Sequence, residues 1–595
     1  MNKRRMSLQI ALLATAVLLV VLTSMPVASQ GPSSDSPNAQ RELERGQRAK
    51  APLLQSGTVT GAGSGGHGSI QSATASTVSG PRSFAPVSGD TGVLPIRHEQ
   101  DEAAYLSAKQ AAEQSRHLPA VKSANNDGDS AGPQLNRPNA PQVLPPQGIS
   151  YQAVGYTGWI PPDPIIAVTP SDVIVAVNSS FYVTDKANPG NLLFSSTFAS
   201  WFNCCGISLP AGTQIFDPKL VYDFINHRVV MVVLAENSSS SPTKSWFLVS
   251  VAQQSSAVGG WRNYAFDATL NGSTSTTNFA DYTEIGTDGA NLYISTNMYS
   301  SGGVFQYVKI RMLKLSELYG GSIASGWWDF WSLAHADSTK AFSAQPAHHY
   351  FSGPPMYFIS AENNLSTSSG NILTTFEIIP PGSNNWPAVA PSFVRVATIT
   401  TLNTFAIPVN AQQPGTSTLI DTGDDRILSA RYWGGDIWAT QGCQNTANSN
   451  AGLCVYGVTT GGSKFFEVNG WNSTGFDYYY PSLAADWDEN IAIVFSRSSP
   501  SEYASIRYTG KRWTDNVNLE GSVLVKSGED TYVNVAGGRN RWGDYTGIER
   551  DPGNDVTFWL FNEYAKPQVS GVGRWSTWLF TVYYPYPLYM PLVKR

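Results

Sequence analysis

The sequence predicts an all-β fold, a single β-propeller of seven four-stranded blades, with six or eight blades as alternatives. Three observations predict this fold. Almost all aromatic residues lie in one part of the chain. That part alternates short β-branched and aromatic runs with Gly, Pro, Asn and Asp. One strand–turn–strand outline also recurs along it, which is typical of a repeat architecture.

The aromatic residues divide the chain of 595 residues into two unlike parts. Of its 17 Trp, 27 Tyr and 25 Phe, only Phe84 and Tyr105 precede residue 147. A segment with so few aromatic residues buries too little apolar surface to offset the entropy lost on folding. We therefore expect a disordered linker or pro-segment at 30–145 and a propeller domain at 146–583. One helix is expected inside the linker, near 101–116, where Ala and Leu recur at helical spacing.

Residues 1–29 predict a secretory signal peptide. Basic residues precede an apolar stretch from Ile10 to Leu22, and Val27-Ala28-Ser29 offers a small-residue cleavage site. The alternative is an uncleaved anchor, but about 13–15 apolar residues are short for a ~30 Å bilayer core. We expect no membrane span after cleavage, and a secreted or cell-surface protein.

Seven units of the body share an acidic or turn residue, a short strand, a turn and a second strand. The units begin at Asp163, Asp217, Asp281, His348, Asp425, Tyr480 and Asp544. The predicted strand pairs are 163–168 with 173–177, 217–223 with 229–233, 281–288 with 292–295, 346–351 with 356–359, 425–431 with 436–439, 480–486 with 491–495, and 544–551 with 556–560.

The spacing of these units distinguishes the propeller from its alternative, a pair of β-sandwiches. Units about 63 residues apart have room for four strands each but are short for sandwiches of about 100 residues. A hairpin with one apolar face is marginal alone, so neighbouring sheets must bury it. We expect residues near Tyr151–Ile160 to complete the last blade. Residues 584–595 form an apolar, Pro-rich tail, for which a sorting or surface-retention role is a hypothesis.

The closing part of the body resembles the last blade of uncharacterised secreted propellers. The resemblance rests on Arg541-Trp-Gly-Asp-Tyr-Thr-Gly followed by Phe558-Trp-Leu-Phe-Asn-Glu-Tyr. The body as a whole resembles the secreted propellers grouped loosely with the sialidase-like superfamily. The sialidase Asp-box, Ser-x-Asp-x-Gly-x-x-Trp, is found in none of the units. The resemblance therefore implies fold and compartment, and no catalytic residue is carried over from it.

Composition narrows the class of protein further. With 42% hydrophobic residues the chain is not disordered throughout, and a net charge of -6 argues against a nucleic-acid binder. Four cysteines form at most two disulfides, too few to stabilise a chain of 595 residues, so this is not a small disulfide-rich scaffold. Cys443 and Cys454 flank an Asn/Gly-rich loop, so we expect a disulfide between them. Cys204 and Cys205 either form a vicinal disulfide, stay reduced, or pair elsewhere.

Equivalent residues of a propeller form a ring, so the unit starts are expected to converge near one mouth of the central channel. The candidate ligand-binding residues are Asp163, Asp217, His348, Asp425, Arg431, Tyr480, Arg541 and Trp542. Several carboxylates at one mouth create a negative funnel that suits Ca²⁺ or the hydroxyls of a sugar. The alternative is that each Asp only caps a turn through nearby backbone N–H groups. His348 is either a metal ligand or base, or a packed core histidine.

Paired carboxylates across a cleft would suit glycoside hydrolysis, and a Tyr beside a Glu with several Arg would suit sialidase-like chemistry. The candidate catalytic residues are Asp281, Glu284, Asp544, Glu549 and Tyr545. Exposed aromatic side chains at 478–480, at 327–328 and at Trp542 would suit sugar stacking; the alternative is that they pack in the core.

Three functions are compatible with this sequence. The first is a non-catalytic secreted or surface propeller, a monomer, that binds an extracellular glycan or small molecule. The second is a carbohydrate-active enzyme of sialidase-like architecture, and the third is a structural envelope or adhesion protein. No motif requires a cofactor, and Ca²⁺ is the only candidate metal.

Overall fold

The structure is a computed structural model. It describes residues 64–68, 73–78, 101–116 and 147–584, apart from 204–206, 354, 363–368, 383–385, 387, 446–448, 516–517 and 555. The predicted signal peptide, the pair Cys204 and Cys205, and the tail from residue 585 onward lie outside the described residues.

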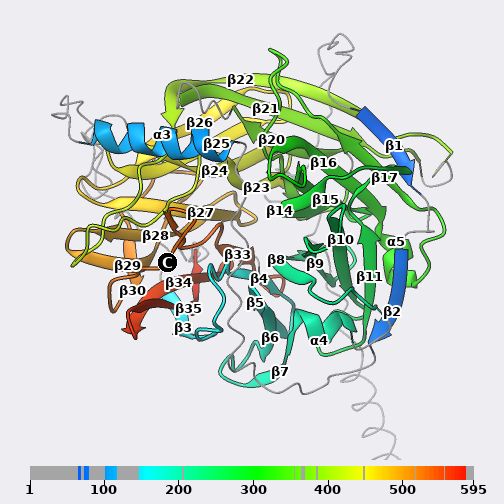
Figure 1. The fold of residues 1–595 in the computed structure, drawn as a ribbon, viewed down its shortest axis with the longest axis horizontal. Coiled ribbons are helices and arrows are strands. Elements are labelled where there is room, and N and C mark those ends of the chain that lie inside the picture. Colours follow the sequence, from blue (N-terminus) through cyan, green and yellow to red (C-terminus); the bar gives the residue numbers. More distant parts are fainter. Residues whose placement is uncertain are drawn as a thin grey trace, which may run out of the picture. The chain divides into compact units, whose positions relative to one another are not determined.

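The body is a seven-bladed β-propeller, as the sequence predicts. Seven sheets lie around a common centre, with the first strand of each blade nearest to it (Figure 1). Each unit identified in the sequence becomes one blade, because its two apolar strands pair and the next unit covers them. The predicted first strand 346–351 of the fourth unit is wrong in part: Pro346 pairs with the second strand of that unit, whereas His348 and His349 pair with the next blade. We number the blades 1 to 7 in chain order.

The strands of the first four blades follow one another in sequence. Blade 1 contains β4 (Ile165–Val168), β5 (Asp172–Val177), β6 (Ser180–Asp185) and β7 (Leu192–Thr197). Blade 2 contains β8 (Gln214–Asp223), β9 (Arg228–Asn237), β10 (Lys244–Ala252) and β11 (Trp261–Asp267). Blade 3 contains β14 (Phe279–Thr287), β15 (Asn291–Tyr299), β16 (Phe305–Lys314) and β17 (Trp327–Trp331). Blade 4 contains β18 (Gln345–Pro346), β20 (Met356–Ala361), β21 (Ser369–Ile379) and β22 (Ser392–Ala406).

The last three blades complete the ring. Blade 5 contains β23 (Ile427–Trp433), β24 (Asp436–Gln444), β25 (Ala451–Thr459) and β26 (Lys464–Trp471), and β19 (His348–His349) pairs in parallel with β23. Blade 6 contains β27 (Asp477–Ala485), β28 (Ile491–Ser499), β29 (Glu502–Lys511) and β30 (Val523–Lys526). Blade 7 contains β33 (Gly547–Arg550), β34 (Thr557–Val569), β35 (Val572–Tyr583) and β3 (Gln147–Gln152).

The remaining elements are short. Two ribbons pair β12 (Leu270–Asn271) with β13 (Thr274–Ser275), and β31 (Val535–Ala536) with β32 (Arg539–Asn540). The helices are α3 (Glu102–Ser115), α4 (Phe198–Asn203) and α5 (Leu315–Gly320). No helix among the described residues is long and apolar enough to cross a membrane.

The first strand of the body closes the ring on the last blade. Strand β3 pairs antiparallel with β35, so the outermost strand of blade 7 comes from the start of the domain. The strand begins before the stretch expected from the sequence and ends at Gln152.

Three stretches of the predicted linker are ordered elements. Strand β1 (Ser64–Gly68) adds a fifth strand to blade 3, and β2 (Ala73–Val78) adds one to blade 2. The expected helix near 101–116 is present as α3. It begins directly after its N-cap residue Asp101, whose side chain accepts a hydrogen bond from the Ala104 backbone N–H. Strands at a sheet edge pair through the backbone, so a Gly/Ala/Ser-rich sequence can form them without an apolar pattern.

Helix α3 packs on the propeller through its polar side chains. The Tyr105 hydroxyl donates to Asp421 Oδ1 over 2.6 Å, and Lys109 Nζ donates to Pro408 O and Thr422 Oγ1 over 2.7 and 2.8 Å. Burial lowers the pKa of Lys109 to about 8. These buried polar contacts hold the helix over residues that precede the inner strand of blade 5.

The predicted disulfide between Cys443 and Cys454 is confirmed. It links β24 to β25 across a hairpin of blade 5, and both cysteines are fully buried.

Candidate functional site

Four blades have a residue in the left-handed backbone region near the start of the inner strand, just before β4 in blade 1 and at the fourth residue of β8, β14 and β27 in the others. These residues are Asp163, Asp217, Tyr282 and Tyr480, with φ of 49°, 51°, 51° and 52°. In blades 2, 3 and 6 the same position is a β-bulge in the pairing of the first two strands. Asp tolerates this conformation better than most residues, and a bulge redirects the side chains next to it.

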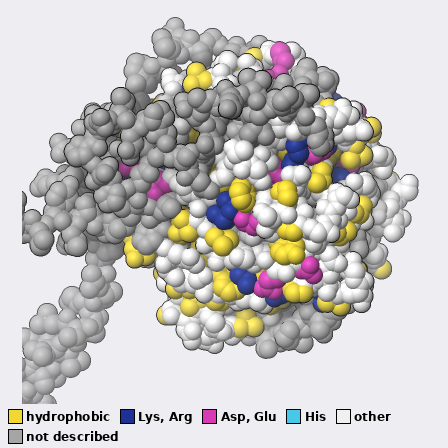
Figure 2. Space-filling model, turned by 90° about the vertical axis from the view of Figure 1, so that its left-hand side faces the viewer, with side chains coloured by type: hydrophobic (Ala, Val, Ile, Leu, Met, Phe, Trp, Pro, Cys, Tyr) yellow, Lys and Arg dark blue, Asp and Glu magenta, His cyan; other side chains and the backbone are white. Residues whose placement is uncertain are grey.

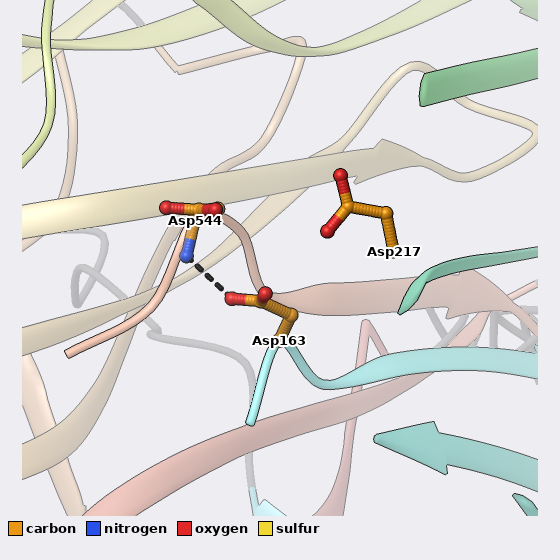
Figure 3. Close-up of side chains that lie close together, drawn as sticks. All are labelled: Asp163, Asp217 and Asp544. Carbon is orange, nitrogen blue, oxygen red and sulfur yellow. Dashed lines mark hydrogen bonds between the residues drawn. The ribbon is translucent and has the colours of Figure 1, made fainter. Parts of the chain in front are cut away.

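Three of the predicted residues meet at the centre of the propeller. Asp163 of blade 1, Asp217 of blade 2 and Asp544 before the inner strand of blade 7 each place a carboxylate oxygen within 4.8 Å of the others. Figure 3 shows the three carboxylates around a common space. We call these residues the acidic cluster.

Hydrogen bonds between blades hold the acidic cluster in place. Asp163 Oδ1 accepts from the Asp544 backbone N–H over 2.7 Å, and its Oδ2 accepts from Asn178 Nδ2 over 2.7 Å. Asn178 Oδ1 accepts in turn from the Asp217 backbone N–H over 2.9 Å, and Asp217 Oδ2 accepts from the Tyr282 backbone N–H over 3.1 Å. The Arg541 guanidinium lies 3.0 Å from Asp544. These bonds join blades 7, 1, 2 and 3.

Glu563 of strand β34 is a fourth carboxylate beside the cluster. Its side chain is fully buried, and neither oxygen has a hydrogen-bond partner among the described residues. A Cβ atom added at Gly543 would lie 2.6 Å from Glu563 Oε1 and 3.7 Å from Asp163 Oδ1. The two carboxylate oxygens therefore both lie close to Gly543, next to the same small space. Burial, then Asp163 and Asp544, raise the pKa of Glu563 well above its usual value. The sequence analysis missed this residue, although a glutamate inside the apolar run 558–564 is a detectable signal.

A buried lysine, Lys219, and Tyr545 fill the space next to the cluster. Lys219 Nζ forms an ion pair with Glu284 Oε1 over 2.8 Å and lies 3.1 Å from the centre of the Tyr545 ring. The Tyr545 hydroxyl donates to Pro218 O over 2.9 Å, from blade 7 to blade 2. Burial lowers the pKa of Lys219, and its pairing with Glu284 opposes that shift. This part of the centre is therefore packed with side chains.

Asp281 borders the cluster without joining it. Its Oδ1 accepts a hydrogen bond from the Tyr282 backbone N–H over 2.8 Å, while the bulge residue of blade 3 is Tyr282 and not Asp281. The unit starts are therefore equivalent only to within one residue. The nearby Glu236 of β9, which the sequence did not single out, has its pKa raised to about 7 by burial and by Asp281.

The other predicted residues lie away from the acidic cluster. His348 is buried, its Nδ1 accepts from the Thr287 backbone N–H, and its Nε2 faces Tyr222 O over 3.2 Å. Burial lowers its pKa well below the usual value, which describes a neutral core histidine. Burial and Asp424 raise the pKa of Asp425 well above its usual value.

Four further candidates make contacts within or between blades. The Tyr480 hydroxyl donates to Asp421 O over 3.2 Å, and Trp542 Nε1 donates to Ser496 Oγ over 3.2 Å. Arg431 Nη2 donates to Ile548 O over 3.2 Å. Glu549 Oε1 accepts from the Arg550 backbone N–H over 2.9 Å, and burial raises its pKa to about 7.

These residues do not form an open binding surface, because their side chains are buried. Every predicted catalytic or ligand-binding side chain is buried except Arg431, which is half-buried. The aromatic residues proposed for stacking are also buried, except the half-buried Trp328, so they pack in the core.

An exposed aromatic pair lies elsewhere, on blades 5 and 6. Phe465 of β26 is 39% exposed and Trp513, just after β29, is 40% exposed. Their ring centres are 5.8 Å apart, and the buried Trp438 supports both at 5.3 and 6.4 Å. We call this pair the Phe465–Trp513 platform. Figure 2 views the side that lies to the left in Figure 1, where hydrophobic side chains stand among charged ones.

Comparison with known proteins gives structural likenesses only. No family model and no curated protein matches the chain. The Trypanosoma rangeli sialidase, in complex with the inhibitor DANA, is 10% identical with a TM-score of 0.30. The match covers 61% of this chain and 54% of the sialidase, so it spans about half of that protein.

Two further solved structures have similar scores. The α-L-arabinofuranosidase of Fusarium graminearum with arabinobiose is 8% identical over 50% of this chain and 92% of its own, with a TM-score of 0.29. A protein of unknown function from Dyadobacter fermentans is 9% identical over 73% of this chain and 97% of its own, with a TM-score of 0.32. The seven blades themselves follow from the strand pairing, and no ligand or reaction is taken from these likenesses.

Proposed function

We propose that this chain is a secreted or cell-surface propeller that binds an extracellular glycan without hydrolysing it. One observation carries the proposal. The carboxylates predicted for catalysis are buried, whereas the two aromatic side chains of the Phe465–Trp513 platform are 39% and 40% exposed to solvent.

The platform has the features of a stacking surface. Exposed aromatic groups supported by a buried tryptophan offer apolar area at little cost in side-chain entropy. A Cβ atom at Gly457 would lie 2.4 Å from the Phe465 ring, so the ring rests directly on the strand below. Polar groups lie alongside: Asn490 Oδ1 accepts from the Trp513 backbone N–H over 3.0 Å, and Lys464 Nζ donates to Thr400 O over 3.2 Å. A rigid apolar face with a polar rim suits a sugar ring.

The test is a glycan array probed with the full chain and two variants. We expect Trp513→Ala to weaken binding of the bound glycans at least about tenfold, because the stacking partner is removed. Tyr583→Ala is the matched control, since Tyr583 is an aromatic residue of blade 7 that is 38% exposed. Equal losses in both variants, or no loss in Trp513→Ala, would refute a binding role for the platform.

Hydrolysis assays on the same glycans distinguish the enzyme alternative. Turnover of any bound glycan would contradict the non-catalytic proposal. Loss of that turnover in Asp281→Asn or Asp544→Asn would then place catalysis at the centre of the propeller. A chain that binds no glycan at all would favour the structural envelope or adhesion role.

A further inference from the structure

The charge balance at the centre of the propeller is incomplete. Asp163, Asp217, Asp544 and Glu563 place four carboxyl groups in an almost fully buried region. Two cations lie beside them: Arg541 pairs with Asp544, and Lys219, which pairs with Glu284, also acts on Asp217 and Asp163. Burying uncompensated carboxylates costs several kcal/mol each, so such groups are protonated or bind a cation.

The geometry of the cluster matches oxygen coordination of one ion. Two oxygens bound to the same Ca²⁺ at 2.3–2.6 Å lie at most about 5 Å apart. One oxygen of each aspartate lies within 4.8 Å of the others, and the carboxylates surround a common space (Figure 3). Asp163 and Asp217 accept hydrogen bonds from N–H groups, and an ionised carboxylate has about four lone-pair sites.

Glu563 supplies an independent observation. It is fully buried on a different strand, both its oxygens are without a hydrogen-bond partner among the residues that the structure describes, and it borders Asp163 Oδ1 at Gly543. An acceptor-only side chain held in this way needs a proton donor or a cation. No described N–H or O–H group fills that role.

We propose that Asp163, Asp217, Asp544 and Glu563 form a binding site for one Ca²⁺ ion that joins blades 1, 2 and 7. Blades 7 and 1 are the last and the first of the ring, so the ion also fastens the first blade to the last. Arg541 offsets part of the negative charge of the site through its ion pair with Asp544. The site is separate from the Phe465–Trp513 platform and does not depend on glycan binding.

The experiment uses the full chain, stripped with a chelator and then titrated with CaCl₂. We expect one Ca²⁺ per chain by calorimetry and metal analysis, and a Tm that rises by several degrees when the ion binds. Glu563→Gln is the key variant, because it removes a charge without breaking a described hydrogen bond, and it should weaken Ca²⁺ binding at least about tenfold. Asp217→Asn should do the same.

Glu549→Gln is the matched control, since Glu549 is another fully buried carboxyl group of blade 7 that lies outside the cluster. It should bind Ca²⁺ as the original chain does. Calcium bound equally by Glu563→Gln and by the control would overturn the proposed ligands. A folded chain that takes up no Ca²⁺ and shows no change in Tm would overturn the site itself. MgCl₂ in place of CaCl₂ should bind more weakly, because Mg²⁺ demands a tighter octahedral shell.

Discussion

Glu549 shows how burial alone sets the chemistry of a side chain in this protein. Its Oε1 accepts from the Arg550 backbone N–H, and Arg431 and Arg550 oppose the effect of desolvation. Desolvation still prevails and raises its pKa to about 7, so the folded protein holds a proton that the unfolded chain releases near pH 4.5. Single carboxyl groups therefore make the stability depend on pH.

We predict that the original chain loses stability as pH rises from about 4.5 to 7, and that Glu549→Gln loses less. Between these values the folded state binds more protons than the unfolded state, so stability falls with pH. A shift of this size corresponds to about 3 kcal/mol. Gln keeps the acceptor for the Arg550 N–H and has no charge to desolvate. Urea unfolding at pH 5 and pH 8 measures the effect; a variant with the same pH dependence as the original chain would disprove it.

At the scale of the element, the turn between the first two strands is stabilised in the same way in four blades. An aspartate at the end of the inner strand accepts hydrogen bonds from two backbone N–H groups of the turn that follows. These aspartates are Asp223, Asp288, Asp486 and Asp551. The repeat seen in the sequence therefore has a structural cause at this turn, in addition to the apolar pattern of the strands.

We predict that Asp288→Ala destabilises the propeller by about 2–3 kcal/mol, because two backbone donors lose their acceptor. Asp288 Oδ1 accepts from the N–H groups of Ala290 and Asn291 over 2.8 and 2.7 Å, and its Oδ2 accepts from the Tyr293 hydroxyl over 2.9 Å. Asp288→Asn keeps the Oδ1 acceptor and should cost clearly less. Urea unfolding of both variants checks the difference, and equal losses would show that the charge, not the turn, matters.

At the scale of the whole molecule, ring closure depends on a strand from the start of the domain. Strand β3 is the outermost strand of blade 7, and the next residues continue the contact: the Val154 N–H donates to Thr577 Oγ1 over 2.8 Å. The acidic cluster joins the same first and last blades at the centre. Closure is thus made at both the rim and the axis of the ring.

We predict that a chain starting at residue 147 folds and unfolds cooperatively, whereas one starting at residue 154 has a clearly lower Tm. The first lacks α3, β1 and β2 but keeps β3; the second exposes the edge of β35 to solvent. Thermal unfolding followed by circular dichroism compares the two. Identical Tm values would mean that β3 contributes nothing to closure.

The sequence alone predicted seven blades, with six or eight as alternatives, the position of six of the seven inner strand pairs, the helix near 101–116 and the disulfide between Cys443 and Cys454. These features follow from residues that are close together in the sequence. Apolar alternation and turn residues specify a strand pair locally, whatever its place in the fold. The same reasoning did not reveal β1 and β2, because edge pairing through the backbone leaves little mark on side-chain pattern.

Only the tertiary structure decided which charged residues meet. The repeat placed seven unit starts in one ring, yet Asp163, Asp217 and Asp544 come together while Asp425 and His348 lie elsewhere. In blade 3 the bulge position is occupied by Tyr282, one residue after the predicted unit start Asp281. Glu563 and Trp513 were not recognised because burial and exposure depend on the neighbouring blade, which no local pattern encodes. The sequence therefore determined the ring, and the packing of blade on blade decided where its charge and its exposed aromatic faces lie.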